Sequence, residues 1–188
     1  MIEHYRVIGG KSCLNEQTLR QAALLEEKLL QVFPVKVYAA MRYWKPSTQD
    51  TLEAIERDGI RKVILLPLYP QYSVATTASS VKEWEKHAEV RGLGAETELI
   101  ESYYDHPTYI DAFVERIRAG LERFDPAIRD EVTILFSAHG TPMKLVRKGD
   151  PYSAHIARTV EEITERGKIN QQTTLCYQSK VGPLKWLT

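Results

Sequence analysis

Apolar positions alternate along the chain between a helical period and short continuous runs. The clearest helical period begins at Pro107 and returns an apolar side chain every three or four residues as far as Phe124. Short apolar runs at residues 35–39, 63–68, 97–102, 132–136 and 173–177 predict strands. The run at 63–68 is apolar almost without interruption, so we expect it to be buried on both sides.

Residue types at the ends of the helical stretches predict where helices begin and end. Leu19 and Phe33 belong to one apolar helix face, which Glu26 interrupts and Pro34 ends. The next helix is predicted to open at Ser47, with Asp50 as its capping-box partner, and to end at Gly59.

Further helices are predicted around Trp84 and from Asp150-Pro151 to Gly167. Strands and helices therefore alternate repeatedly, which predicts an α/β fold whose helices wind a parallel sheet. A break at Asp125-Pro126 divides these elements into two units, residues 1–125 and 131–188.

The second predicted unit holds too few elements to bury a parallel sheet alone. We therefore expect the chain to be a piece of a longer protein in which this unit is incomplete. Its apolar strands are expected to expose an edge and a face, which favours self-association.

Composition excludes several classes of function. The formal net charge is zero over 188 residues, so neither a nucleic acid nor an anionic membrane surface is expected as a partner. The longest apolar runs are too short to span a bilayer, so no transmembrane segment is expected. Cys13 and Cys176 form no CxxC pair, which indicates a reduced, cytoplasmic protein without a structural zinc site.

The strongest candidate for chemistry is His139, in the segment Ser137-Ala138-His139-Gly140-Thr141-Pro142 after the predicted strand 132–136. Ligands bind at the carboxyl ends of strands in open α/β sheets, and an imidazole there either accepts a proton near neutral pH or binds a borderline metal ion. No second histidine, cysteine or carboxylate lies within four residues, so a partner must come from elsewhere in the fold. The alternative is an inert histidine bonded to backbone.

A tyrosine-rich turn follows the predicted strand 63–68. Tyr72 and Ser73 belong to it, and the hydroxyl-bearing residues continue to Ser80. Aromatic and hydroxyl groups at a strand exit suit a flat, apolar ligand with polar edges. The same hydroxyls serve equally well as helix caps.

Polar loops also occur near both ends of the chain. Tyr5 and Ser12 flank Gly9-Gly10, a pair that permits a tight loop close to a ligand. Residues 177–187 combine a polar strand exit with a Gly-Pro turn and Trp186. Taken singly, each is explained equally well as an ordinary loop.

Taken together and in order, these segments resemble the ferrochelatase family. The shared motifs are Tyr5-Arg6-Val7-Ile8-Gly9-Gly10-Lys11-Ser12, Arg42-Tyr43, Tyr69-Pro70-Gln71-Tyr72-Ser73, the His139 segment with Gly149-Asp150-Pro151-Tyr152, and Gln178-Ser179-Lys180-Val181-Gly182-Pro183. Each motif alone is weak, whereas the whole series in register from Tyr5 to Leu187 is specific. Cys13 and Thr141 depart from the family, which has a proline and an aliphatic residue there.

The resemblance implies a type II chelatase of two Rossmann-like parallel-sheet units with helices on both faces. Such an enzyme is a lyase that inserts ferrous iron into a porphyrin in haem biosynthesis. By resemblance, His139 is the catalytic imidazole and the group that meets the metal. The implied porphyrin contacts are Tyr5, Ser12, Tyr72, Ser73 and Ser80. Iron enters as a substrate, and no tightly bound cofactor is expected.

The resemblance also implies that family members have a strand before Tyr5 and, beyond Thr188, a glutamate that faces the histidine across the porphyrin. We therefore expect residues 1–188 alone to be inactive or nearly so. Two alternatives remain: a non-catalytic or self-associating remnant, and another small-ligand-binding doubly wound α/β module. The sequence leaves open whether the porphyrin is protoporphyrin or coproporphyrin, and whether His139 acts as base or metal ligand.

Overall fold

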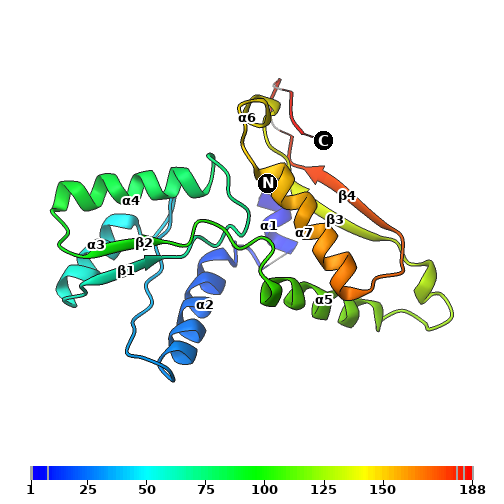
Figure 1. The fold of residues 1–188 in the computed structure, drawn as a ribbon, viewed down its shortest axis with the longest axis horizontal. Coiled ribbons are helices and arrows are strands. Elements are labelled where there is room, and N and C mark those ends of the chain that lie inside the picture. Colours follow the sequence, from blue (N-terminus) through cyan, green and yellow to red (C-terminus); the bar gives the residue numbers. More distant parts are fainter. Residues whose placement is uncertain (1, 8, 181, 184, 188) are drawn as a thin grey trace. The chain divides into compact units, whose positions relative to one another are not determined.

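The computed structural model describes the chain except residues 1, 8, 181, 184 and 188. Its helices are α1 (Ile2–Val7), α2 (Leu14–Leu29), α3 (Thr48–Arg57), α4 (Thr77–Arg91), α5 (Pro107–Leu121), α6 (Met143–Arg147) and α7 (Tyr152–Gly167) (Figure 1). Its strands are β1 (Lys62–Leu65), β2 (Glu96–Leu99), β3 (Ile134–His139) and β4 (Thr173–Gln178), with a 3-10 turn at Arg129–Glu131. The α/β class is therefore confirmed.

Contacts group the chain into two compact units. The first unit is Met1–Val63 with Lys82–Glu96, and the second is Ile64–Val81 with Thr97–Thr188. This grouping differs from the predicted halves 1–125 and 131–188, because α5 packs against α7 within the second unit. The halves describe the longer family fold, and they stay a prediction.

Helix α3 begins and ends as its sequence predicts. The Ser47 hydroxyl accepts the Asp50 N–H at 3.1 Å, and the Asp50 carboxylate accepts the Ser47 N–H at 2.8 Å. Gly59 follows the helix with φ +67°, a conformation that costs glycine little. Leu52 and Ile55 are 0% and 2% exposed, so the predicted core face is confirmed.

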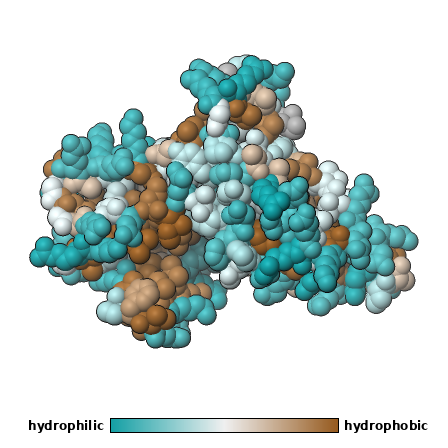
Figure 2. Space-filling view, in the orientation of Figure 1, coloured by the Kyte–Doolittle hydropathy of each residue, from teal (hydrophilic) through white to brown (hydrophobic). Residues whose placement is uncertain are grey.

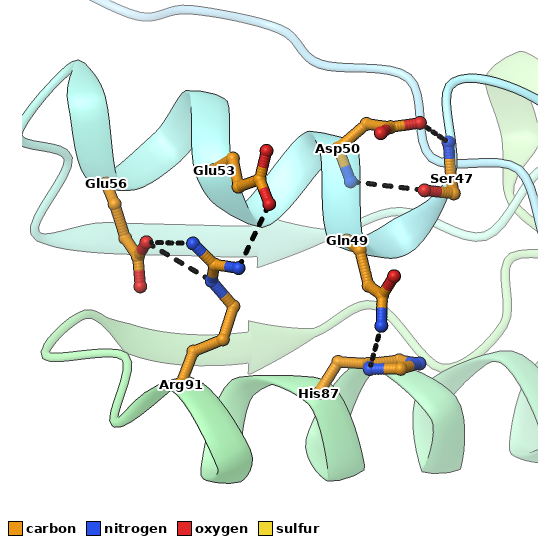
Figure 3. Close-up of polar contacts among 7 residues, drawn as sticks. All are labelled: Ser47, Gln49, Asp50, Glu53, Glu56, His87 and Arg91. Atoms are coloured by element: carbon orange, nitrogen blue, oxygen red, sulfur yellow. Dashed lines mark hydrogen bonds and ion pairs between the residues drawn. The ribbon is translucent and has the colours of Figure 1, made fainter.

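Polar side chains on α3 and α4 meet across the outside of this packing (Figure 3). The Arg91 guanidinium reaches Glu56 at 2.7 Å and Glu53 at 3.2 Å, and Gln49 lies 3.3 Å from His87. Exposed pairs of this kind contribute little to stability.

The segment 35–39 is extended but is not a strand, so that prediction is wrong. The Val37 N–H donates to the Glu26 carboxylate at 2.6 Å, and the Thr51 hydroxyl donates to the Ala39 carbonyl at 2.8 Å. Side chains therefore take up backbone groups that a neighbouring strand would otherwise satisfy. Glu26 interrupts the apolar face of α2 because its carboxylate serves this neighbouring segment.

Strands β1 and β2 form a two-stranded sheet. The Glu96 N–H donates to the Arg61 carbonyl at 2.9 Å and the Ile100 N–H to the Leu65 carbonyl at 3.0 Å, so the partners advance in the same direction and the pair is parallel. Ile64 is 57% exposed. The prediction that 63–68 is buried on both sides is therefore wrong, because so narrow a sheet leaves part of the strand uncovered.

Strands β3 and β4 form a second parallel pair, in register from Ile134 opposite Thr173 to His139 opposite Gln178. One face packs through Phe136 against the core of α5 and α7, made by Ile110, Val114 and Ile163. On the other face the exposed residues are Leu135, Ser137, His139, Thr174, Cys176 and Gln178. Among the described residues, helices cover one face of this sheet only, which agrees with the exposed face expected for an incomplete second unit.

Helix α2 carries apolar side chains that nothing in the described part of the chain buries. At its end, Leu30, Val32 and Phe33 are 53%, 77% and 48% exposed. Figure 2 shows this end as a brown patch at lower left. Within the described residues, no helix has both the length and the hydropathy needed to cross a membrane.

Candidate functional site

His139 is the last residue of β3, and its side chain is exposed. Side chains alternate along a strand, so His139 shares the open face of the sheet with Ser137, while Ala138 is buried. The position agrees with the prediction that the imidazole emerges at the carboxyl end of a parallel strand.

Gly140 holds the backbone after His139 against the neighbouring strand. Its N–H donates to the Gln178 carbonyl at 2.7 Å, and a Cβ at this position would lie 2.9 Å from the carbonyl oxygens of Gln178 and Leu187. Real Cβ atoms essentially never approach that closely, so only glycine fits. The end of β3 is therefore fixed tightly beside the end of β4.

Asp150, just before α7, fixes the turn at residues 71–74. The Ser73 hydroxyl and the Val74 N–H both donate to one carboxylate oxygen at 2.9 Å, and the Tyr152 N–H donates to the other at 3.0 Å. Asp150 is 8% exposed and Ser73 only 1%. The carboxylate therefore joins the turn to the first turn of α7 in a largely dry environment.

The side chain of His155, in α7, holds the backbone of the same 71–74 turn. The Tyr72 N–H donates to His155 Nδ1 at 3.3 Å, and the His155 ring stacks on Tyr104 with centroids 3.8 Å apart. A ring nitrogen accepts only when it carries no proton, so this bond requires a neutral imidazole with its proton on Nε2.

The surroundings of His155 favour that neutral form. Burial lowers the pKa of the imidazole, and it outweighs the opposing charges of Asp105, Asp150 and Glu101. The pKa shift therefore acts in the direction that keeps the Tyr72 bond.

A third bond reaches the turn from α7. The Gln71 side-chain amide donates to the Thr159 hydroxyl at 3.1 Å, and that hydroxyl donates to the Tyr104 carbonyl at 2.8 Å. Gln71 and Thr159 are 9% and 5% exposed. Residues 71, 72 and 73 thus each bond to α7 or to Asp150, two residues before it.

The first turn of α7 also touches the end of β3. Burial and the neighbouring Tyr177 raise the pKa of Tyr152, and a hydrogen bond with the His139 backbone opposes that rise. One helix start therefore contacts both candidate segments, the 71–74 turn through Asp150 and the end of β3 through Tyr152.

The predicted site residues divide between the two units. His139, Tyr72, Ser73 and Ser80 belong to the second unit, and Ser80 lies half-buried in the first turn of α4. Ser73 is inaccessible here, because its hydroxyl is bonded to Asp150 and almost fully buried.

Tyr5 and Ser12 belong to the first unit. Tyr5 lies on α1 with 39% of its surface exposed, and the Ser12 hydroxyl accepts the Leu14 N–H at 3.2 Å. Three residues of the motifs, Ile8, Val181 and Leu184, lie outside the described residues.

Sequence reasoning missed the supporting residues Asp150, His155 and Thr159. Asp150 was predicted as part of a helix start and of a family motif, without a role in holding another segment, and His155 shares no ligand spacing with another histidine. Their partners lie 77 to 88 residues away in the chain, so no local pattern reveals them. The described residues contain no cluster of three or more side chains suited to hold a metal ion.

Comparison with known proteins bears directly on this site. The family model described as Ferrochelatase matches residues 1–188. The ferrochelatase of Geotalea uraniireducens is 46% identical over 185 residues, covering 98% of this chain and 56% of the relative. The ferrochelatases of Aquifex aeolicus and of a Drosophila simulans Wolbachia are 44% and 43% identical, covering 98% and 97% of this chain and 57% and 58% of the relatives.

The chain thus spans somewhat over half the length of the curated relatives it matches. The match covers every motif of the sequence, from the glycine pair before α2 to the segment after β4. With a full-length family match and close relatives of one name, the chain belongs to the ferrochelatase family.

Proposed function

We propose that this chain supplies the imidazole side of a site that inserts ferrous iron into a porphyrin. The observation that carries the proposal is the exposed His139 at the end of β3, joined through the start of α7 to a tyrosine-bearing turn. Relatives named ferrochelatase match almost all of the chain, which supports the same reaction.

The chemistry asks for such a group. Metallation removes both pyrrole N–H protons while the iron sheds water and takes their place on the ring nitrogens. A neutral imidazole over one face of the ring either accepts a pyrrole proton or binds the incoming Fe²⁺. A pocket that bends the macrocycle exposes the nitrogen lone pairs, so binding energy is used for distortion.

We propose that Tyr5, Ser12, Tyr72 and Ser80 are porphyrin contacts. Tyr72 is half-buried, so its ring offers apolar area beside the polar backbone of the turn. Ser73 supports the turn instead of touching the ligand, since its hydroxyl is bonded to Asp150.

A chimera tests the reaction directly. This chain would replace the matching 185 residues of the Geotalea uraniireducens ferrochelatase, and zinc-porphyrin formation would be followed by absorbance. We expect turnover in the chimera, none above background with His139→Ala, and near-normal turnover with His106→Ala. His106 is a suitable control because it is exposed and its side chain does not cap α5. An inactive chimera that still folds would contradict the proposal.

Residues 1–188 alone are expected to bind porphyrin weakly, to form little zinc-porphyrin and to self-associate. Leu135 is 64% exposed on the open face of the β3–β4 sheet, which supports association through that face. We also propose a cytoplasmic location, consistent with Cys13 and Cys176 being free. Sedimentation would measure the mass of residues 1–188 in solution. A monomeric mass across a wide concentration range would contradict the proposed self-association.

A further inference from the structure

The turn at residues 71–74 is bonded to α7 more heavily than a surface turn requires. Gln71, Tyr72 and Ser73 each make a specific bond to a side chain of α7 or to Asp150 just before it. Val74 adds a fourth bond through its N–H to Asp150. The bond from the Tyr152 N–H at the start of α7 uses one Asp150 oxygen, and the bonds to the other oxygen come from the turn.

We propose that Asp150 and His155 are positioning residues that hold the Tyr72 turn in its porphyrin-binding conformation before substrate arrives. This rests on the proposed function, because the turn matters here as the carrier of a porphyrin contact. Neither side chain touches substrate in this account. Each acts through the turn.

The two residues hold different parts of the turn. Asp150 is a charged acceptor, 8% exposed, for two groups of the turn, and buried bonds to a charged acceptor are stronger than neutral ones. His155 accepts from the Tyr72 backbone itself, next to the ring assigned to the ligand. A turn fixed in advance loses less conformational entropy when it binds a ligand.

The stacking of His155 on Tyr104 restrains the ring while its unprotonated Nδ1 accepts the Tyr72 N–H. The rings are 12° from parallel, and the Thr159 hydroxyl bonds the carbonyl of the same Tyr104. His155 therefore has separable parts, a ring that stacks and a nitrogen that accepts. Different substitutions remove one and keep the other.

The test uses residues 1–188 with deuteroporphyrin as the probe and two measurements, amide hydrogen exchange at residues 72 and 74 and porphyrin affinity by absorbance titration. Asp150→Asn places an NH₂ donor against the turn. Its matched control is Asp125→Asn, whose carboxylate accepts one N–H in an exposed turn. We expect exchange at Val74 to be about tenfold faster and the porphyrin Kd about tenfold higher for Asp150→Asn only.

The histidine variants separate acceptor from stacking. His155→Phe keeps a ring on Tyr104 but no acceptor, whereas Asn in His155→Asn keeps an acceptor oxygen near the place of Nδ1. We expect faster Tyr72 exchange and weaker binding in the first, and at least partial rescue of both in the second. Circular dichroism and the melting curve show which variants fold. If Asp150→Asn does not fold, the comparison of His155→Phe with His155→Asn still tests the proposal.

The outcomes are distinguishable. Faster exchange with unchanged porphyrin affinity would overturn the positioning role while leaving the proposed function intact. Unchanged exchange in Asp150→Asn and His155→Phe would show that these residues do not hold the turn, and would also overturn it. A folded wild-type chain with no porphyrin affinity would contradict the proposed function, and the positioning role would fall with it.

Discussion

Two turns carry proposed porphyrin contacts, and the chain builds them in opposite ways. The 71–74 turn is bonded by the buried side chains of Asp150 and Thr159 and by the half-buried His155. In the 9–12 turn, Gly9 and Gly10 have φ of +93° and +81°, and a Cβ on either would meet nothing within 4 Å. The first turn is held by its neighbours, and the second depends on a backbone conformation that glycine alone adopts readily.

The difference concerns where the order of a binding site comes from. Ser73 and Gln71 cannot move without breaking bonds to Asp150 or Thr159. Among the described residues, the Ser12 hydroxyl accepts from the N–H of Leu14, two residues further on, and Ser12 is exposed. We therefore expect the 71–74 turn to be rigid before ligand binds and the 9–12 turn to be easily altered.

The largest expected effect comes from removing the carboxylate that holds the first turn. Asp150→Ala leaves the Ser73 hydroxyl and the N–H groups of Val74 and Tyr152 without their acceptor. We expect a loss of about 2–4 kcal/mol in the free energy of unfolding, measured in urea. Asp125→Ala, the exposed counterpart, should cost under about 1 kcal/mol. Equal losses in the two variants would break the comparison.

Substitutions of two separate glycines, Gly140 and Gly120, are expected to give the next largest effects, with opposite signs. Gly140→Ala forces a Cβ to within 2.9 Å of two backbone carbonyl oxygens. We therefore expect the free energy of unfolding, measured by thermal melting, to fall by about 1–3 kcal/mol. Gly120 lies inside α5 with nothing within 4 Å of a Cβ, and Gly120→Ala should stabilise by about 0.5–1 kcal/mol. The same sign for both substitutions would contradict the close approach at the end of β3.

Acid should loosen the first turn and spare the second. The pKa of His155 is lowered by burial, so the unfolded chain binds its proton more readily than the folded one. This contribution to stability is present above the usual pKa of about 6.5 and is lost as the pH falls from there through the lowered value. Tyr72 amide exchange, corrected for its intrinsic pH dependence, should accelerate across that window in the wild type. In His155→Asn we expect the corrected Tyr72 exchange rate to stay constant with pH. The same pH dependence in the wild type and the variant would exclude His155 as the cause.

The smallest effect is expected in the open turn. Ser12→Ala removes one exposed hydrogen bond to the Leu14 N–H. It should change the free energy of unfolding, measured by thermal melting, by no more than about 0.5 kcal/mol. Porphyrin affinity should fall measurably, because Ser12 is assigned a contact and not a structural role. A large loss of stability without loss of affinity would reverse that assignment.

Local patterns made much of the fold predictable. The Ser47–Asp50 capping box and the Gly59 stop are confirmed because each depends on residues a few positions apart. The predicted strand at 35–39 fails because its groups bond to Glu26 and Thr51, which its own pattern does not reveal. Burial of Ile64 fails for the same kind of reason, since it depends on how many strands lie alongside.

The site divides in the same way. His139 was predictable because a polar segment directly follows an apolar strand. Asp150 and His155 were not, because their partners come from a turn far away in the sequence, and only folding brings it to the start of α7. The sequence therefore reveals the group proposed to do the chemistry more readily than the groups that hold the 71–74 turn in place.

The central claim is that His139 performs chemistry on a porphyrin that other residues bind. The most direct measurement compares the chimera with its His139→Ala variant, recording deuteroporphyrin affinity and the rate of zinc insertion in the same cuvette. We predict that affinity changes by less than about threefold, because binding comes mainly from apolar wall area, while insertion falls to background. Insertion at the unsubstituted rate in the variant would contradict the account.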